Sequence, residues 1–149
     1  MENIDEKSMY TGLITLAIID INGYLSVIDN VEEQLKEPKE IISLVLLKKK
    51  VEEVHIKVIE KMYKDLSKIY IRLEILKNKI IKDEKRIKPY FKQFDEHKTK
   101  YEQKKVDLMK KIKKYITNVN TLMLKAGIYL EEHSDELEQY NLKNSLGVN

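Results

Sequence analysis

The 149-residue chain contains no cysteine and no tryptophan, and only four glycines and two prolines. Without cysteine, a disulfide framework and thiolate metal sites are excluded. The scarcity of glycine and proline argues against a β-sandwich or an α/β enzyme, because those folds need many turn residues. Charged residues make up 36% of the chain and apolar residues 42%, as in long helices with charged outer faces. The length fits a single domain spanning residues 1–149.

Long uninterrupted apolar runs are also missing. The run from Leu13 to Ile19 is short and ends at Asp20, and the residues at the N-terminus are acidic rather than basic. Neither feature fits a transmembrane helix or a signal peptide. We therefore expect a cytoplasmic protein.

Apolar residues recur at steps of three and four along most of the chain, which predicts an all-α fold. The first helix is expected over about residues 6–36 and the second over about 39–86, with Pro38 ending one and starting the other. The stripe of the second helix contains an extra four-residue step, which predicts a stutter. That stripe consists of Leu44, Leu47, Val51, Val54, Val58, Met62, Leu66, Ile69, Leu73, Leu76 and Ile80.

The third helix, over about residues 90–132, has the most regular heptad pattern. A short final helix is expected to be capped by Ser134 and to end near Leu142. The core d positions of the third helix are Phe94, Tyr101, Leu108, Tyr115, Leu122 and Tyr129, and its a positions are Phe91, Lys98, Lys105, Ile112, Val119 and Ala126.

Two local features leave alternatives open. Asn22-Gly23 lies between apolar runs, so residues 13–28 form either part of a helix or a β-hairpin, and we favour the helix because nothing else reads as a strand. Near Pro89 the chain either turns back or continues as one kinked helix. We favour the turn, because two arms of equal length then bury each other's stripes.

The expected architecture is a three- or four-helix bundle base with a long antiparallel two-helix coiled-coil arm. The base is formed by about residues 6–66 and 112–143, and the arm by about residues 67–111. Lysines at two a positions of the third helix would thin the core of the arm.

Two surfaces are candidates for binding. The first is apolar, because the first helix carries more apolar residues than one stripe needs; it comprises Leu13, Leu16, Ile18, Tyr90, Phe91 and Phe94. The second is a basic patch in residues 77–114, which hold fifteen basic and six acidic residues. The patch comprises Lys82, Lys85, Arg86, Lys88, Lys110, Lys111, Lys113 and Lys114.

No group of residues predicts catalysis. Glu52 and His55 have the spacing of two metal ligands on a helix, but the motif is not repeated. The acidic cluster at residues 131–138 lacks the pattern of a calcium loop. We therefore expect no cofactor, no metal and no small-molecule substrate.

The sequence favours a non-enzymatic interaction protein that binds itself or a helical partner through coiled-coil surfaces, without contacting a membrane. The alternative is a nucleic-acid-binding accessory protein that uses the basic region 77–114. The near absence of arginine speaks against that alternative, because phosphate and base recognition favour the planar guanidinium group.

Overall fold

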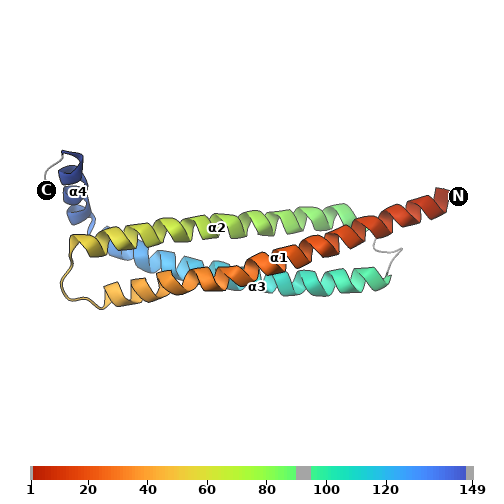
Figure 1. Ribbon diagram of the computed structural model, residues 1–149, viewed down its shortest axis with the longest axis horizontal. Helices are drawn as coiled ribbons and strands as arrows, with labels where there is room; N and C mark the ends of the chain where they lie inside the picture. The colour runs from red at the N-terminus through yellow and green to blue at the C-terminus, as the bar shows by residue number, and fades with distance from the viewer. Residues whose placement is uncertain (1, 90–94, 147–149) are drawn as a thin grey trace. The chain divides into compact units, whose positions relative to one another are not determined.

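The computed structural model describes residues 2–89 and 95–146, with side chains at residues 9, 11–89 and 98–146. Within these residues the chain forms four helices and no strand, and the helices pack as an all-α bundle (Figure 1), which confirms the predicted fold class. Residues 13–28 are helical throughout, so the hairpin alternative is excluded. The helices are α1 (Glu2–Leu46), α2 (Glu53–Ile87), α3 (Asp95–Glu132) and α4 (Ser134–Ser145).

The first helix does not end at Pro38, contrary to prediction. Pro38 lies inside α1 and is buried, and the three-and-four spacing continues past it through Leu35, Ile42 and Val45, which are also buried. A proline inside a helix costs about 3 kcal/mol. Full burial of one aliphatic side chain contributes roughly 1.5–3 kcal/mol. Burying both Ile42 and Val45 therefore offsets the proline and keeps the helix intact.

The helix break lies instead at residues 47–52. Continuation of the α1 heptad would place Lys49 and Glu52 at the next two core positions, so further helix would bury charge rather than apolar surface. Three consecutive lysines, residues 48–50, add repulsion between like charges. These charged residues mark the end of the helix in the sequence, and Pro38 marks a competing position for that end.

The position of the break also changes the register of α2. The predicted core residues Leu44, Leu47 and Val54 are exposed, whereas Ile56 and Ile59 are fully buried. The predicted stutter disappears, because it arose from joining the end of α1 to α2. From Met62 onward the predicted stripe is confirmed: Met62, Leu66, Ile69, Leu73 and Ile80 are buried, and Leu76 is half-buried.

The heptad of α3 is confirmed wherever the structure describes side chains. Tyr101, Leu108, Tyr115, Leu122 and Tyr129 are buried at d, and Ile112, Val119 and Ala126 are buried at a. Phe91 and Phe94 lie outside the described residues.

The helices group into two compact units. Unit 1 contains Met1–Val31 and Arg72–Tyr115, and unit 2 contains Glu32–Ile71 and Ile116–Asn149. In unit 1 the first part of α1 packs with the last part of α2 and the first part of α3. The stretch expected to be a two-helix arm therefore has a third helical segment beside it, because α1 is long enough to bury Ile14, Ile21 and Ile28 there.

Polar contacts connect each pair of helices in unit 1. The Lys105 ammonium at an a position lies 2.5 Å from the Glu84 carboxylate of α2, which explains how a charge is accommodated at the core edge. This contact also shows that α3 folds back on α2, so one helix kinked at Pro89 is excluded. The Lys104 ammonium donates to the Asn22 side-chain oxygen of α1 at 2.5 Å. The Lys79 ammonium lies 5.3 Å from the centroid of the Tyr24 ring.

The last helix differs by one residue from the prediction at its start. Its N-cap is His133 rather than Ser134, and its end is Ser145 rather than Leu142. The centroid of the His133 ring lies 4.7 Å from that of the Tyr129 ring, with the two rings tilted by 54°, and the His133 Nδ1 lies 3.0 Å from a carboxylate oxygen of Glu136. These two contacts hold His133 at the turn. No residue of α4 is buried.

Candidate interaction surfaces

One side of α1 in unit 1 is apolar yet uncovered. We call it the α1 outer face and define it as Met9, Gly12, Leu16, Ile19, Gly23 and Val27. Met9, Gly12, Leu16, Ile19 and Gly23 occupy outward heptad positions opposite the buried stripe, and Val27 lies at an exposed g position beside that stripe. Leu16 is 59% exposed, Ile19 is 56% exposed and Val27 is 58% exposed. Outward positions of a solvated coiled-coil helix are normally charged, as they are in α3, where Lys110, Lys113 and Lys114 occupy them.

The structure separates the residues predicted for the apolar surface. Leu16 is exposed as expected and Leu13 is half-buried, but Ile18 is only 8% exposed and belongs to the core. Helical periodicity could not make this distinction, because α1 is apolar around most of its circumference. Tyr90, Phe91 and Phe94 lie outside the described residues.

Packing inside the chain does not explain the two glycines of the α1 outer face. Among the described residues, a Cβ atom added at Gly12 or Gly23 would meet no atom within 4 Å other than its chain neighbours and the nearby backbone of its own helix. Each glycine inside a helix costs roughly 1 kcal/mol relative to alanine. By contrast, a Cβ atom at Gly127 of α3 would meet the Tyr63 ring at 3.7 Å.

By length and composition α1 could cross a bilayer. Thr11–Leu46 contains an 18-residue window with a mean hydropathy of 1.6, of which 28% is buried in the bundle. The expectation that no transmembrane helix fits is therefore not confirmed by these two criteria, because the helix continues past Asp20 and Gly23 without a break. The same test is also passed by core helices of soluble proteins.

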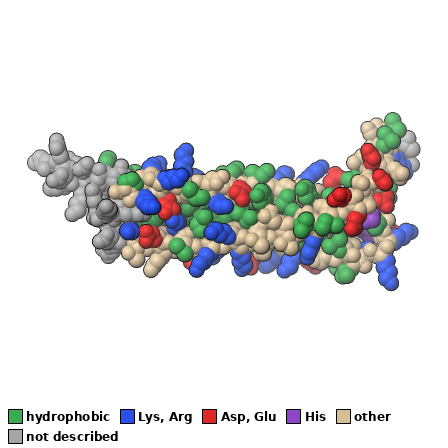
Figure 2. Space-filling view, turned by 180° about the vertical axis from the view of Figure 1, so that it is seen from behind, with side chains coloured by type: hydrophobic (Ala, Val, Ile, Leu, Met, Phe, Trp, Pro, Cys, Tyr) green, Lys and Arg blue, Asp and Glu red, His purple; other side chains and the backbone are tan. Residues whose placement is uncertain are grey.

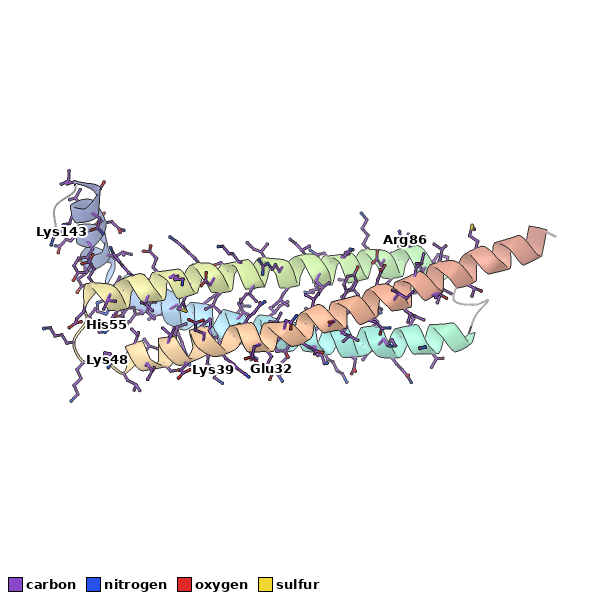
Figure 3. The ribbon with its side chains drawn as sticks, viewed as in Figure 1. Glu32, Lys39, Lys48, His55, Arg86 and Lys143 are labelled. Atoms are coloured by element: carbon purple, nitrogen blue, oxygen red, sulfur yellow. The ribbon has the colours of Figure 1, made fainter. Side chains whose placement is uncertain are left out.

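The predicted basic patch is exposed but partly neutralised. Lys82, Lys85, Arg86 and Lys88 lie near the C-terminal end of α2, where Figure 3 labels Arg86. Arg86 lies 3.7 Å from the Asp83 carboxylate, and Lys111 lies 3.4 Å from the Asp29 carboxylate of α1. Lys110, Lys113 and Lys114 point outward from α3, and Lys114 also lies 5.8 Å from the Tyr115 ring centroid. Figure 2 shows lysines and arginines scattered among other side chains on the face that it presents.

The histidine at residue 55 has a structural role. It lies in the first turn of α2 (Figure 3), and its Nδ1 accepts a hydrogen bond from the Glu52 backbone N–H at 3.2 Å. Glu52 is the residue before the helix, so this contact is the side-chain half of a capping box. An Nδ1 that accepts a hydrogen bond has no proton to donate and no lone pair free for a metal.

Among the described residues there is no group of three or more histidine, aspartate or glutamate side chains that could hold a metal ion. The acidic cluster at residues 131–138 therefore forms no such site there. Burial raises the pKa of Tyr101 to about 12, with the Glu84 and Asp83 carboxylates adding to the effect. The phenol accordingly stays neutral at ordinary pH.

Two shallow grooves lie in unit 2. One is mostly apolar and is lined by Glu53, Val54, Lys57, Val58 and Lys61 at the start of α2. The other lies between α1 and α3 and is lined by Leu35, Lys39, Ser43, Asn118, Thr121, Leu122 and Lys125.

Comparisons of the chain with protein families, with curated proteins and with solved structures found no match.

Proposed function

We propose that the protein is a non-enzymatic interaction protein of the cytoplasm that binds an apolar helix, of itself or of another protein, through the α1 outer face. The observation that carries the proposal is the exposure of Leu16 and Ile19 on the side of α1 opposite its buried stripe, with Val27 exposed at the edge of that side. A contiguous apolar face on a helix that already has a core is typical of a binding surface.

The glycines support a helix as the bound group. Gly12 and Gly23 flatten the α1 outer face at both ends, so that a second backbone could approach closely. Since no contact within the chain requires them, their cost to helix stability is consistent with a role in binding.

Lipid is a weaker explanation for this face. The apolar stretch contains Asp20, and residues 29–40 that follow it contain five acidic and two basic residues. An anionic bilayer surface would repel that segment. A protein partner can bind the α1 outer face without bringing residues 29–40 close to an anionic surface.

Site-specific photo-crosslinking tests the proposal. We expect a benzophenone amino acid at Leu16 to give a covalent adduct with a protein in cells of the native host. The same group at Val106, which is 49% exposed on the charged surface of α3, is the matched control and should give much less. Ile19→Lys should abolish the Leu16 adduct, because a buried ammonium in an apolar contact is unfavourable. Adducts with lipid, or equal adducts at both positions, would contradict the proposal.

The alternative function is nucleic-acid binding by the basic region, which the outward position of Lys110, Lys113 and Lys114 favours. We expect duplex and single-stranded oligonucleotides to bind weakly near 150 mM salt, because neighbouring carboxylates reduce the positive field. Fluorescence anisotropy measures this. Tight, salt-dependent binding that is lost when Lys110, Lys111, Lys113 and Lys114 are replaced by glutamine would favour the alternative instead.

A further inference from the structure

Unit 2 carries two outward strips of opposite charge on two of its helices. The acidic strip is on α1 and consists of Glu33, Glu37, Glu40 and Leu44. The basic strip is on α2 and consists of Val54, Lys57, Lys61 and Lys64. All eight side chains are exposed, and each lies at an outward heptad position of its helix.

The two strips pair one to one, to within one residue along the helix axis, when the helices run antiparallel. The acidic strip advances by steps of four, three and four residues, and the basic strip, read backward from Lys64, by steps of three, four and three. Each strip covers nearly three helical turns, or roughly 15–17 Å. In this alignment Glu33 meets Lys64, Glu37 meets Lys61 and Glu40 meets Lys57. Leu44 then meets Val54.

The apolar pair of this alignment, Leu44 with Val54, lies at the groove at the start of α2. Val54, Val58, Lys57 and Lys61 line the mostly apolar groove at the start of α2. Leu44 is 54% exposed and Val54 is 56% exposed, although both were predicted as core residues. A leucine placed over Val54 and Val58 would fill this groove while the carboxylates before it reach the lysines.

Competing contacts within the chain are weak. Glu33 pairs with Lys36 at 2.8 Å, Lys57 with Glu53 at 3.1 Å and Lys64 with Glu60 at 3.4 Å, each as a solvent-accessible pair about one turn apart on the same helix. Such pairs contribute roughly 0.3–0.5 kcal/mol, so exchanging them for contacts with another molecule costs little. No ion pair of Glu37, Glu40 or Lys61 occurs within the described residues.

We infer that these strips form a self-association interface, in which the acidic α1 strip of one copy docks antiparallel on the basic α2 strip of a second copy. A second copy is the occupant because this chain presents both halves of the complementary pair. A nucleic acid or an anionic membrane would satisfy only the lysines and would repel the acidic strip. The interface goes beyond the proposed function, because it uses none of the residues of the α1 outer face.

The contact is small, which places it in the class of weak and salt-sensitive associations. Sedimentation velocity of the full chain at about 200 μM should therefore show self-association near 20 mM salt and its loss near 0.5 M salt. Purely apolar association would instead persist or strengthen at high salt.

Charge reversal tests the pairing itself. We expect E37K/E40K alone, and K57E/K61E alone, to raise the self-association Kd at least tenfold at low salt, because like charges then face each other. An equimolar mixture of the two variants should associate again, because each supplies the strip that the other lacks. E131K/E132K reverses two exposed acidic residues elsewhere in unit 2 and should leave association unchanged.

Circular dichroism establishes that the variants are folded, which is expected since all the substituted side chains are exposed. A monomeric wild type at low salt, unchanged association of either variant alone, or a mixture that stays monomeric would each overturn the inference. Photo-crosslinking at Leu16 should be unaffected by E37K/E40K, so failure here is distinguishable from failure of the proposed function.

Discussion

Leu108→Ala is expected to lower the free energy of unfolding by about 2–5 kcal/mol. Leu108 is fully buried at a d position of α3, in the unit where α1, α2 and α3 all contribute segments. Removing its side chain leaves a cavity that three helices cannot readily close. Urea denaturation followed by circular dichroism at 222 nm measures the change.

Val106→Ala is the matched control for this substitution. Val106 is on the same helix two residues before Leu108, at an outward position, and is 49% exposed, so its truncation should change stability by no more than about 0.5 kcal/mol. A two-helix arm would leave Leu108 partly open and would reduce the effect of its truncation. A loss below about 1 kcal/mol for Leu108→Ala would therefore contradict the packing of α1 in unit 1.

Pro38→Leu should raise the free energy of unfolding by about 1–3 kcal/mol. Pro38 occupies a core position inside α1, where it removes one backbone hydrogen bond and crowds the preceding turn at a cost of about 3 kcal/mol. Leucine restores the donor and suits a d position. The gain is reduced by about 0.4–1 kcal/mol, because proline also restricts the unfolded chain.

Pro38→Ala separates the backbone from the packing contribution. Alanine restores the same hydrogen bond but loses the buried ring, so its gain should be smaller than that of leucine. Chemical denaturation of the three proteins gives the order. If Pro38→Leu destabilises the protein, the ring packs in a way that leucine cannot reproduce, and the assigned cost of the proline is wrong.

The buried side of a helix was predicted correctly from the sequence where the apolar residues lie mainly on one side of that helix. In α3, apolar residues recur every three to four positions and most outward positions are polar or charged, so the heptad pattern places Leu108, Leu122 and Tyr129 inward, although Leu124 and Ile128 are exposed. The same holds for α2 after Met62. Amphipathic periodicity identifies the buried side directly when only one side is apolar.

The candidate surfaces were harder to predict for the same reason. Leu16 and Ile18 are equally apolar neighbours on α1, yet one is exposed and the other belongs to the core. The charged strips of unit 2 were not predicted at all, because Leu44 and Val54 had been assigned to a core stripe. If the helix break is placed at residues 47–52, the heptad patterns of α1 and α2 put both strips at outward positions.

The sequence by itself determined that the protein is helical and that α3 and most of α2 have one buried side. These features depend on contacts between residues three or four apart, which any helix brings together. Only the tertiary structure decided that α1 continues through Pro38, that it packs in both units and that its second apolar side stays exposed. The first outcome depends on burial of Ile42 and Val45, whose free energy outweighs a local helix-breaking signal. The other two depend on which segments of α2 and α3 pack with α1 in each unit.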